Sequence, residues 1–394
     1  MTIMVRRATD ADWPGFRLCA EVSFGNPQSD GRFGMFRSLF EPPGWGYVAR
    51  EGDAVVGTAG ALSFRLTVPG GAQLDAAGVS WVSVLPTHRR RGVLRAMYDT
   101  LHADLDVPVA ILTASEATIY GRFGYGSATV TASVRVDRRA AVFRPDAPDP
   151  GGVRIMSPAD AAELLPPRYD RWRAQTPGAF ERSPAMWDRI VADPEDGRTG
   201  GKRAFAMVHE DGYALWRNVD GETRSARVEE LRACTDEARI ALWRTLIGLD
   251  FMHYVTADTG PDEPLPHALL DARAVRTLAL RDGIWVRIMD VPAALSARTY
   301  RAALDVVLDV HDPYLNAGGR FRLTTRDGHA ECVRTDAAAD AECQLDTLGS
   351  MYLGGHSAAT LAAANRLRTK DFRTLQALDL AFGTERAPQL GYFF

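Results

Sequence analysis

The chain has 394 residues, of which 46% are hydrophobic and 24% are charged, and its formal net charge is −4. At ~100–200 residues per domain, this length predicts two to four domains, and the apolar fraction excludes a disordered protein. The balance of 46 basic and 50 acidic residues provides no general electrostatic field for nucleic acid or for an anionic membrane surface.

No apolar stretch approaches the ~18 consecutive residues of a membrane span, and the N-terminal residues lack the apolar core of a secretory signal. The eight histidines are scattered without metal-ligand spacing. Neither C-x-x-C spacing nor the density of a disulfide scaffold is found among Cys19, Cys234, Cys332 and Cys343. We therefore expect a cytoplasmic protein that binds no metal, no nucleic acid and no membrane.

The first part of the chain has the pattern of a mixed α/β domain. A cap-like acidic residue followed by apolar spacing predicts a short helix over 10–22, and β-rich runs follow at 46–50, 54–64 and 73–84. An amphipathic helix is predicted over 92–105, and the apolar run 107–114 suits a buried strand. Strand, basic turn, helix and strand together form a crossover unit.

The rest of the chain continues the α/β pattern. Helices are predicted over 168–191, which is rich in Trp and Arg and suits packing between domains, and over 235–249; strands are predicted at 204–209, 212–217, 251–257, 304–310 and 319–325. A Pro- and Gly-rich segment at 143–152 and a change of pattern at 283–292 indicate boundaries. We expect domains over 1–145, 146–287 and 288–394.

The segment 82–95 carries the most informative pattern. Pro86 ends strand pairing because it has no N–H to donate. The N–H groups that follow lie at the start of a helix, unsatisfied and at the positive end of the helix dipole. Gly92 lets a large anion approach the backbone, and the arginines add charge-assisted hydrogen bonds. The segment predicts a pyrophosphate site, with the alternative of a basic helix start that only meets solvent; the predicted contacts are Val82, Ser83, Val84, Arg90, Arg91, Gly92, Val93, Leu94 and Arg95.

This segment resembles the acetyl-CoA motif R/Q-x-x-G-x-G/A of the GCN5-related N-acetyltransferases (GNATs). Residues 89–94 match the motif except at Leu94, and that departure is shared with the enhanced intracellular survival (Eis) family of actinobacteria. Residues 86–95 and 115–126 are both similar to signatures of that family. The resemblance extends over the full chain and implies a GNAT domain, a degenerate second GNAT domain and a C-terminal domain similar to sterol carrier proteins. It also implies a homo-oligomer, specifically a hexamer.

Hydroxyl groups near the second signature suit acyl transfer. Ser115 and Glu116 follow the apolar strand and are expected beside the cofactor. Tyr120 and Tyr125 both lie in a Gly-bounded turn, where a phenol of pKa about 10 can protonate a departing thiolate. The residues leave the choice between the two tyrosines open, and the Eis resemblance implies Tyr120.

The base that deprotonates the acceptor amine is less evident from the residues. Glu116 is one possibility. The Eis resemblance implies instead the α-carboxylate of a terminal phenylalanine, which is Phe394 in this chain. Its reference pKa near 3.5 is low for a base, and burial would raise it. A frayed apolar tail is the alternative.

The resemblance implies an N-acetyltransferase that uses acetyl-CoA and acts on the amines of aminoglycosides or on lysine side chains. An acidic acceptor pocket is then expected, to which Glu21 and Asp30 are candidates. Two other functions stay open. The C-terminal domain could make the protein a carrier of an apolar ligand, or the donor could be a longer acyl-CoA.

Overall fold

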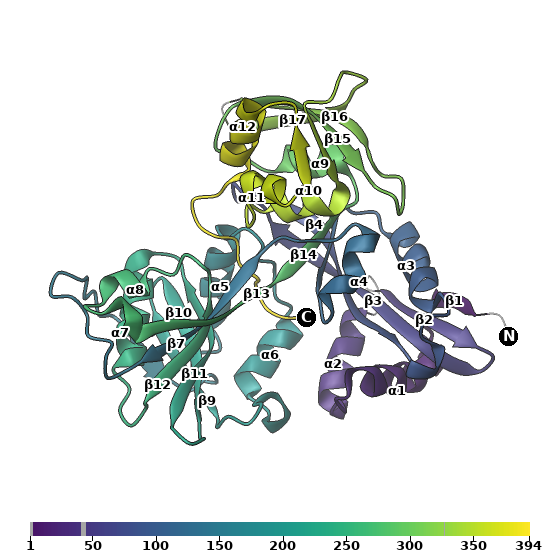
Figure 1. The fold of residues 1–394 in the computed structure, drawn as a ribbon. Coiled ribbons are helices and arrows are strands. Elements are labelled where there is room, and N and C mark those ends of the chain that lie inside the picture. Colours follow the sequence, from purple (N-terminus) through teal and green to yellow (C-terminus); the bar gives the residue numbers. More distant parts are fainter. Residues whose placement is uncertain (1–2, 41–44, 327) are drawn as a thin grey trace.

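Three units, each built on one β-sheet, make up the chain (Figure 1). The computed structural model describes residues 3–40, 45–326 and 328–394. In Figure 1 the first unit lies at the lower right, the second at the lower left and the third above them. The C-terminal segment, drawn in yellow, runs down from the third unit and ends between the other two.

The first unit is a seven-stranded sheet of order β1-β2-β3-β4-β5-β14-β6. Its elements are β1 (Met4–Arg7), α1 (Trp13–Phe24), α2 (Asp30–Phe40), β2 (Trp45–Glu51), β3 (Ala54–Thr67), β4 (Gln73–Val84), α3 (Val93–Asp104), β5 (Val109–Thr113), α4 (Ala117–Tyr120), β6 (Gly126–Ser127) and β14 (Ile284–Ile288). The strands β2, β3 and β4 and the helix α3 form where the sequence pattern predicts them.

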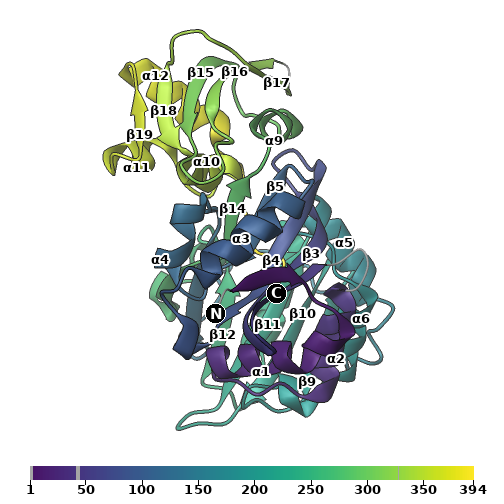
Figure 2. The same ribbon diagram turned by 90° about the vertical axis from the view of Figure 1, so that its right-hand side faces the viewer.

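The two faces of this sheet bury different helices. Met97, Tyr98 and Leu101 of α3 are fully buried against one face, and the burial of Met97 and of Leu101 contributes about 1.5–3 kcal/mol each to folding. The aromatic residues Trp13 and Phe16 of α1 pack on the other face. The sheet therefore separates an α3 side from an α1 side, which Figure 2 shows from another direction.

The second unit is a seven-stranded sheet of order β13-β7-β12-β11-β10-β9-β8. Its elements are β7 (Val130–Asp137), β8 (Arg154–Met156), α5 (Leu165–Ala174), α6 (Pro184–Ala192), β9 (Ala204–His209), β10 (Gly212–Val219), β11 (Ser225–Ala233), α7 (Asp236–Ile247), β12 (Tyr254–Thr259), α8 (Leu265–Ala268) and β13 (Val275–Asp282). The strands β11 and β12 run parallel around α7, which repeats the β4–α3–β5 arrangement of the first unit.

The strand pairing divides the chain differently from the expected boundaries at 145/146 and 287/288. β7 precedes residue 145 but pairs with β12 and β13 of the second sheet. β14 follows the second unit but returns to the first sheet, where it lies between β5 and β6. The Pro- and Gly-rich segment 143–152 is therefore a loop inside the second unit. An alternating strand pattern does not say which sheet the strand joins, so the sequence did not reveal this exchange.

The expected helix over 168–191 is two helices, α5 and α6. Gly178 has φ +88, a conformation that interrupts a right-handed helix. The side chain of Ser183 then accepts a hydrogen bond from the N–H of Met186 and starts α6.

The third unit is a five-stranded sheet of order β17-β16-β15-β18-β19. Its elements are α9 (Val291–Ala297), β15 (Leu304–His311), β16 (Gly319–Arg326), β17 (His329–Arg334), β18 (Ala341–Gln344), α10 (Leu345–Tyr352), α11 (Ala358–Ala363), β19 (Leu367–Thr369) and α12 (Phe372–Phe382). A fully buried ion pair joins it to the first sheet, since Arg287 of β14 donates to Asp312 at 2.8 Å. Breaking such a pair costs about 3–5 kcal/mol.

Candidate active site

The parallel strands β4 and β5 diverge in the middle of the first sheet. They pair only from Ala76–Val109 to Gly78–Ile111, although β4 continues for six more residues to Val84. Trp81 has φ +54, and the register with β3 shifts opposite it, which is the geometry of a β-bulge. The last part of β4 pairs with β3 on one side only. On the side of β5, no described strand pairs with its backbone, which leaves an open edge.

A turn with two left-handed residues connects β4 to α3. Arg90 has φ +60 and Gly92 has φ +79. Gly92 is the N-cap of α3, and no side chain caps the first turn, so the N–H groups of Val93, Leu94 and Arg95 lack helical partners. Such a terminus suits an anion. The predicted turn thus lies beside the open edge of β4.

The three predicted arginines differ in their surroundings. Arg91 donates to Glu51 at 2.5 Å, and hydrogen bonds from Arg91 and then His88 lower the pKa of Glu51 to about 2. Arg95 donates to Asp99 at 2.9 Å. Arg90 is exposed, and its guanidinium has no ion pair within the described ranges. Of the three, Arg90 is the one whose charge is not already balanced by a carboxylate.

Ser83 does not present its hydroxyl to the open edge of β4. Its side chain is buried, with the hydroxyl 2.7 Å from the Thr58 hydroxyl and 3.5 Å from the Cys19 sulfur. Only the backbone of Ser83 is available to a ligand, whereas Val82 and Val84 pack on the α3 side of the sheet.

The two candidate tyrosines lie in different environments beyond β5. Tyr125 is fully buried, and its hydroxyl is 2.8 Å from Nε2 of His102, whose Nδ1 is 3.2 Å from the Tyr314 hydroxyl. Tyr120 is 6% exposed and follows the exposed Ser115 and Glu116. Burial raises the pKa of Tyr120, and the Ser115 hydroxyl partly offsets that increase. Tyr120 is thus the tyrosine whose hydroxyl is not bonded into the core.

The chain end reaches the point where β4 and β5 diverge. The Phe394 ring lies 5.0 Å from Phe64 and 5.3 Å from Phe180, and its backbone oxygen accepts a hydrogen bond from the Thr113 hydroxyl at 3.4 Å. A Cβ at Gly78 would lie 2.9 Å from the same ring. Upstream, the Tyr392 hydroxyl donates to a backbone carbonyl of the second unit at 3.0 Å. Tyr392 and Phe394 are therefore packed between the first and second units, whereas Phe393 is exposed.

A cavity of about 360 Å³ adjoins this tail. Its floor is formed by β9, β10 and β11, and its walls include Arg32, Met35 and Phe36 of α2, Met186, Arg189 and Ile190 of α6, and Tyr392 and Phe393 of the tail. Glu21 and Asp30, expected in an acidic pocket, do not line it; both form ion pairs with Arg17. Its lining holds four arginines and four acidic residues, so the expected acidic character is not observed.

The helix of the second crossover unit, α7, starts with a side-chain cap. At the start of α7 the Thr235 side chain accepts a hydrogen bond from the N–H of Ala238 at 3.2 Å. The helix terminus is thereby capped by the protein itself. The start of α7 therefore differs from that of α3, where no side chain caps the first turn.

The residues that pack around Tyr392 and Phe394 were not predicted from the sequence. Arg182 is buried, donates to Glu230 at 2.6 Å and lies 4.8 Å over the Tyr392 ring. Phe180 and Phe64 form the aromatic wall around Phe394. Each of these is an ordinary core residue in its own segment, and only the tertiary fold brings them together.

The described part of the chain contains no helix that is both long and apolar enough to cross a membrane. Within the same ranges, no three His, Cys, Asp or Glu side chains are grouped so that they could hold a metal ion.

Three regions of the chain match known family models. Residues 4–128 and 178–288 each match a model described as an acetyltransferase (GNAT) domain, and residues 291–391 match a sterol carrier protein domain. The fold and the site thus define a GNAT acetyltransferase with a divergent second GNAT domain, as the sequence resemblance implied. Acetyltransferases of this class use acetyl-CoA.

Full-length relatives narrow this class. The chain is 47% identical over 407 aligned positions to N-acetyltransferase Eis of Mycobacterium tuberculosis (strain H37Ra), covering all of both chains. It is 41% identical to an uncharacterized N-acetyltransferase of Streptomyces avermitilis, covering 87% of this chain and 88% of that one. The crystal structure of Eis1 from Mycobacterium abscessus superimposes with a TM-score of 0.89 at 32% identity, over 99% of this chain and all of that one. The chain belongs to the Eis family and is an N-acetyltransferase.

Proposed function

We propose that the protein transfers an acetyl group directly from acetyl-CoA to a primary amine held in the cavity beside the C-terminal tail. The observation that carries this proposal is the convergence of three features: the open edge of β4, the uncapped start of α3 and the end of the chain at Phe394. The backbone of residues 82–84 would bind the extended pantetheine arm, and Arg90 with the N–H groups of Val93 and Leu94 would bind the pyrophosphate.

Acetyl-CoA supplies the activated thioester; the chain's own residues position the amine and move two protons. The α-carboxylate of Phe394 accepts a proton from the ammonium group of the acceptor, which frees the nitrogen lone pair. The Tyr120 hydroxyl donates a proton to the departing sulfur, and the resulting phenolate takes up the second proton that the nitrogen loses as the amide forms. Positioning and proton transfer of this kind account for most of the rate enhancement in direct transfer.

The proposed acceptors are aminoglycoside-like cationic small molecules and lysine side chains. The cavity of about 360 Å³ lies in the range of small-molecule sites, ~300–1,000 Å³, which supports an acceptor of that size or a single extended side chain. The chain is further proposed to act as a homohexamer, for which light scattering should give six times the 43.1 kDa of one chain.

The carrier alternative receives less support from the third unit. An open cavity there is lined by polar groups, among them Asp309, His311 and Asn316, and a sterol or fatty acyl chain requires an apolar lining. The other alternative, a longer acyl-CoA as the donor, is tested in the same experiment that identifies the acceptor.

The test is a panel of aminoglycosides, polyamines and lysine peptides, with thiol release from acetyl-CoA as the measurement and octanoyl-CoA as a second donor. We expect amine-dependent thiol release with acetyl-CoA and an increase of Tm on acetyl-CoA binding. Thiol release that no amine stimulates, together with a larger Tm increase from a fatty acid or sterol, would favour the carrier instead.

A further inference from the structure

The second sheet has an open edge like that of the first. β11 and β12 pair only from Ser225–Tyr254 to Arg227–Thr256, although β11 continues for six more residues to Ala233. Among the described residues, no other strand pairs with this last part of β11 on the side of β12. The open edge of β11 leads to the start of α7, as the open edge of β4 leads to the start of α3. In the first unit this is the proposed cofactor site.

The C-terminal tail, residues 385–394, passes this part of the second unit. The N–H of Ala387 donates to Asp262, which follows β12, at 2.8 Å. The N–H of Gln389 donates to the Pro177 carbonyl at 2.9 Å. The lining of a cavity of about 200 Å³ includes both Ala387 and Gln389 and residues 233–236 at the junction of β11 and α7. The tail therefore lies beside the part of the second unit that corresponds to the cofactor site of the first.

One contact of the tail comes from β11 itself, through Arg232. Its Nη2 donates to the Gly391 carbonyl at 2.5 Å. The guanidinium is half-buried and lies 4.3 Å from the centre of the Trp172 ring. A hydrogen bond from a charged donor is stronger than one between neutral groups. Arg232 therefore holds the chain three residues before its terminal carboxylate.

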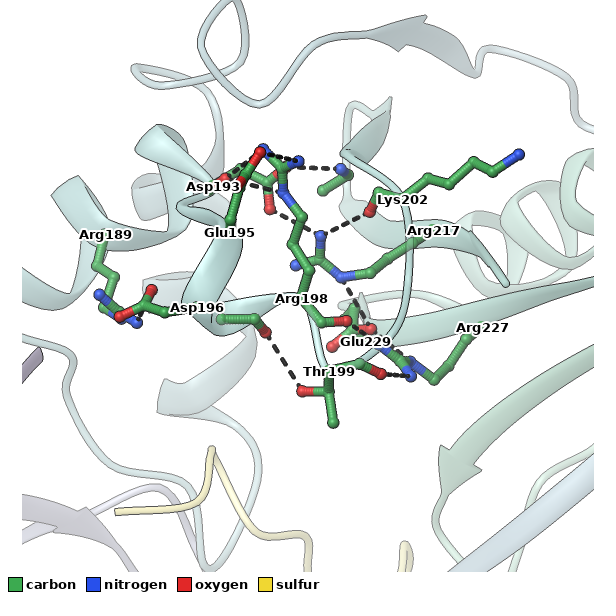
Figure 3. A network of polar contacts seen from close by, with 12 residues as sticks. Arg189, Asp193, Glu195, Asp196, Arg198, Thr199, Lys202, Arg217, Arg227 and Glu229 are labelled. Carbon is green, nitrogen blue, oxygen red and sulfur yellow. Dashed lines mark hydrogen bonds and ion pairs between the residues drawn. The ribbon is translucent and has the colours of Figure 1, made fainter. Parts of the chain in front are cut away.

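The charge of Arg232 is balanced inside the second unit. Burial alone would favour the protonated form of Glu230, but the positive charges of Arg182 and then Arg232 lower the pKa of this carboxyl below its usual value. Figure 3 shows the neighbouring carboxylate of Glu229, which two other arginines of the sheet bind. With its counter-charge in place, Arg232 can bind a neutral carbonyl without leaving a charge unbalanced.

Gly391 has little freedom at this contact. It is buried, and a Cβ at this position would lie 2.8 Å from the Tyr169 hydroxyl. Tyr392 and Phe394, which follow, are buried against Phe180. The direction of the Gly391 carbonyl thus sets the path of the last three residues, and with it the place of the terminal carboxylate.

We propose that Arg232 is a positioning residue for the α-carboxylate of Phe394, and that the open edge of β11 is the docking site of the tail. The inference rests on the proposed function, because it requires that this carboxylate is the base. It gives the divergent second GNAT domain a task in the reaction of the first: the second unit holds the group that takes the proton from the acceptor amine.

Arg232→Met removes the donor and keeps an apolar side chain against Trp172. With the most reactive amine of the panel above, we expect kcat to fall by about 10-fold or more, because a displacement of ~1 Å at a reacting group can cost ~100-fold. The KM for acetyl-CoA should stay unchanged, since the proposed cofactor site lies in the first unit. Arg232→Lys, which retains a donor and the charge, should recover most of the lost kcat. The control is Arg168→Met, which removes another half-buried arginine that donates to backbone carbonyls of the second unit, and it should keep kcat.

A second comparison uses the chain extended after Phe394 by a few Gly and Ser residues, which converts the α-carboxylate into an amide. If Arg232 acts through the carboxylate, Arg232→Met should lower kcat no further in the extended chain. Additive losses of kcat from the two changes, a loss in Arg232→Met that appears in the acetyl-CoA KM instead of kcat, an Arg232→Lys variant as slow as Arg232→Met, or an equal loss in Arg168→Met would each overturn the inference.

Asp262→Ala is a second variant for the case that Arg232→Met does not fold. Asp262 is exposed, so its loss should leave Tm nearly unaltered. It should nevertheless release the N–H of Ala387 and lower kcat in the chain that ends at Phe394, but not in the extended chain. Unchanged kcat in these variants, with kcat lost on extension, would overturn this inference alone. Full kcat in the extended chain would show that the carboxylate is not the base and would overturn this inference as well.

Discussion

Tyr120 and Tyr125 are five residues apart, and their hydroxyl groups have different partners. The Tyr125 hydroxyl is bonded to His102 inside the core, and burial raises the pKa of Tyr125 far above its usual value. Tyr120 lies at the end of α4, next to the segment that carries Ser115. The variants Tyr120→Phe and Tyr125→Phe can therefore be compared directly, because each substitution removes one hydroxyl group and keeps the aromatic ring.

Tyr120→Phe should lower kcat by about 100-fold or more with little change in either KM, since it removes only the donated proton. Tyr125→Phe should instead lower the stability by ~1–3 kcal/mol, because Nε2 of His102 would lose a buried partner. Steady-state kinetics and urea unfolding of both variants measure the two effects. A larger loss of kcat in Tyr125→Phe would reverse the assignment.

His102 should make stability depend on pH. Burial, and then the charge of Arg287, lower its pKa to about 3, whereas the unfolded chain has the ordinary value of about 6.5. Between these values the unfolded state binds the additional proton, so stability falls as pH falls from about 6.5 towards 3. His102→Gln removes the titrating group and keeps a hydrogen-bonding side chain. We expect the Tm of the wild type to fall more steeply than that of His102→Gln between pH 6.5 and 5; parallel curves would contradict this.

At the scale of elements, the β4–α3 turn combines an uncapped helix terminus with Arg90, which has no ion pair among the described residues. The local pattern was sufficient to predict it, because a strand end, Pro86, Gly92 and an amphipathic helix are all neighbours in sequence. The ion pairs of Arg91 and Arg95 were not predictable, since Glu51 lies on a different strand and Asp99 was only one of several carboxylates in reach.

Arg90→Glu should raise the KM for acetyl-CoA by at least about 10-fold, because it places a negative charge beside the proposed pyrophosphate site. The change should leave Tm nearly unaltered, since the side chain is exposed. Arg91→Glu should raise this KM and also lower Tm, because it would face Glu51. The matched control is Arg139→Glu, an exposed reversal in the second unit; an equal KM effect there would exclude a local role for Arg90.

At the scale of the whole molecule, the candidate site combines residues that lie far apart in the sequence. Thr113 and Phe394 meet across 281 positions, and the walls of the cavity come from two units. The family resemblance led to Phe394, but no local pattern could identify Arg182 or Phe180. Such residues have no distinguishing neighbours in sequence and acquire their role only when the units pack.

Appending a few Gly and Ser residues after Phe394 should lower kcat by about 100-fold or more, because the proposed base becomes a neutral amide. Acetyl-CoA should still raise Tm in this variant. The same residues appended before Met1 are the control and should leave kcat unchanged. Full kcat in the C-terminally extended protein would exclude the carboxylate and direct attention to Glu116.

The return of β14 to the first sheet also determines when that sheet can be completed during synthesis. β5 and β14 are separated by about 170 residues. At ~5–20 residues per second, the ribosome needs on the order of ten to thirty seconds to supply them. During that interval the edge of β5 that pairs with β14 in the folded protein is unpaired, and β5 carries the apolar residues Val109 and Ile111. The nascent chain therefore passes through a stage in which a strand beside the candidate active site presents an unpaired edge, to which another chain can pair.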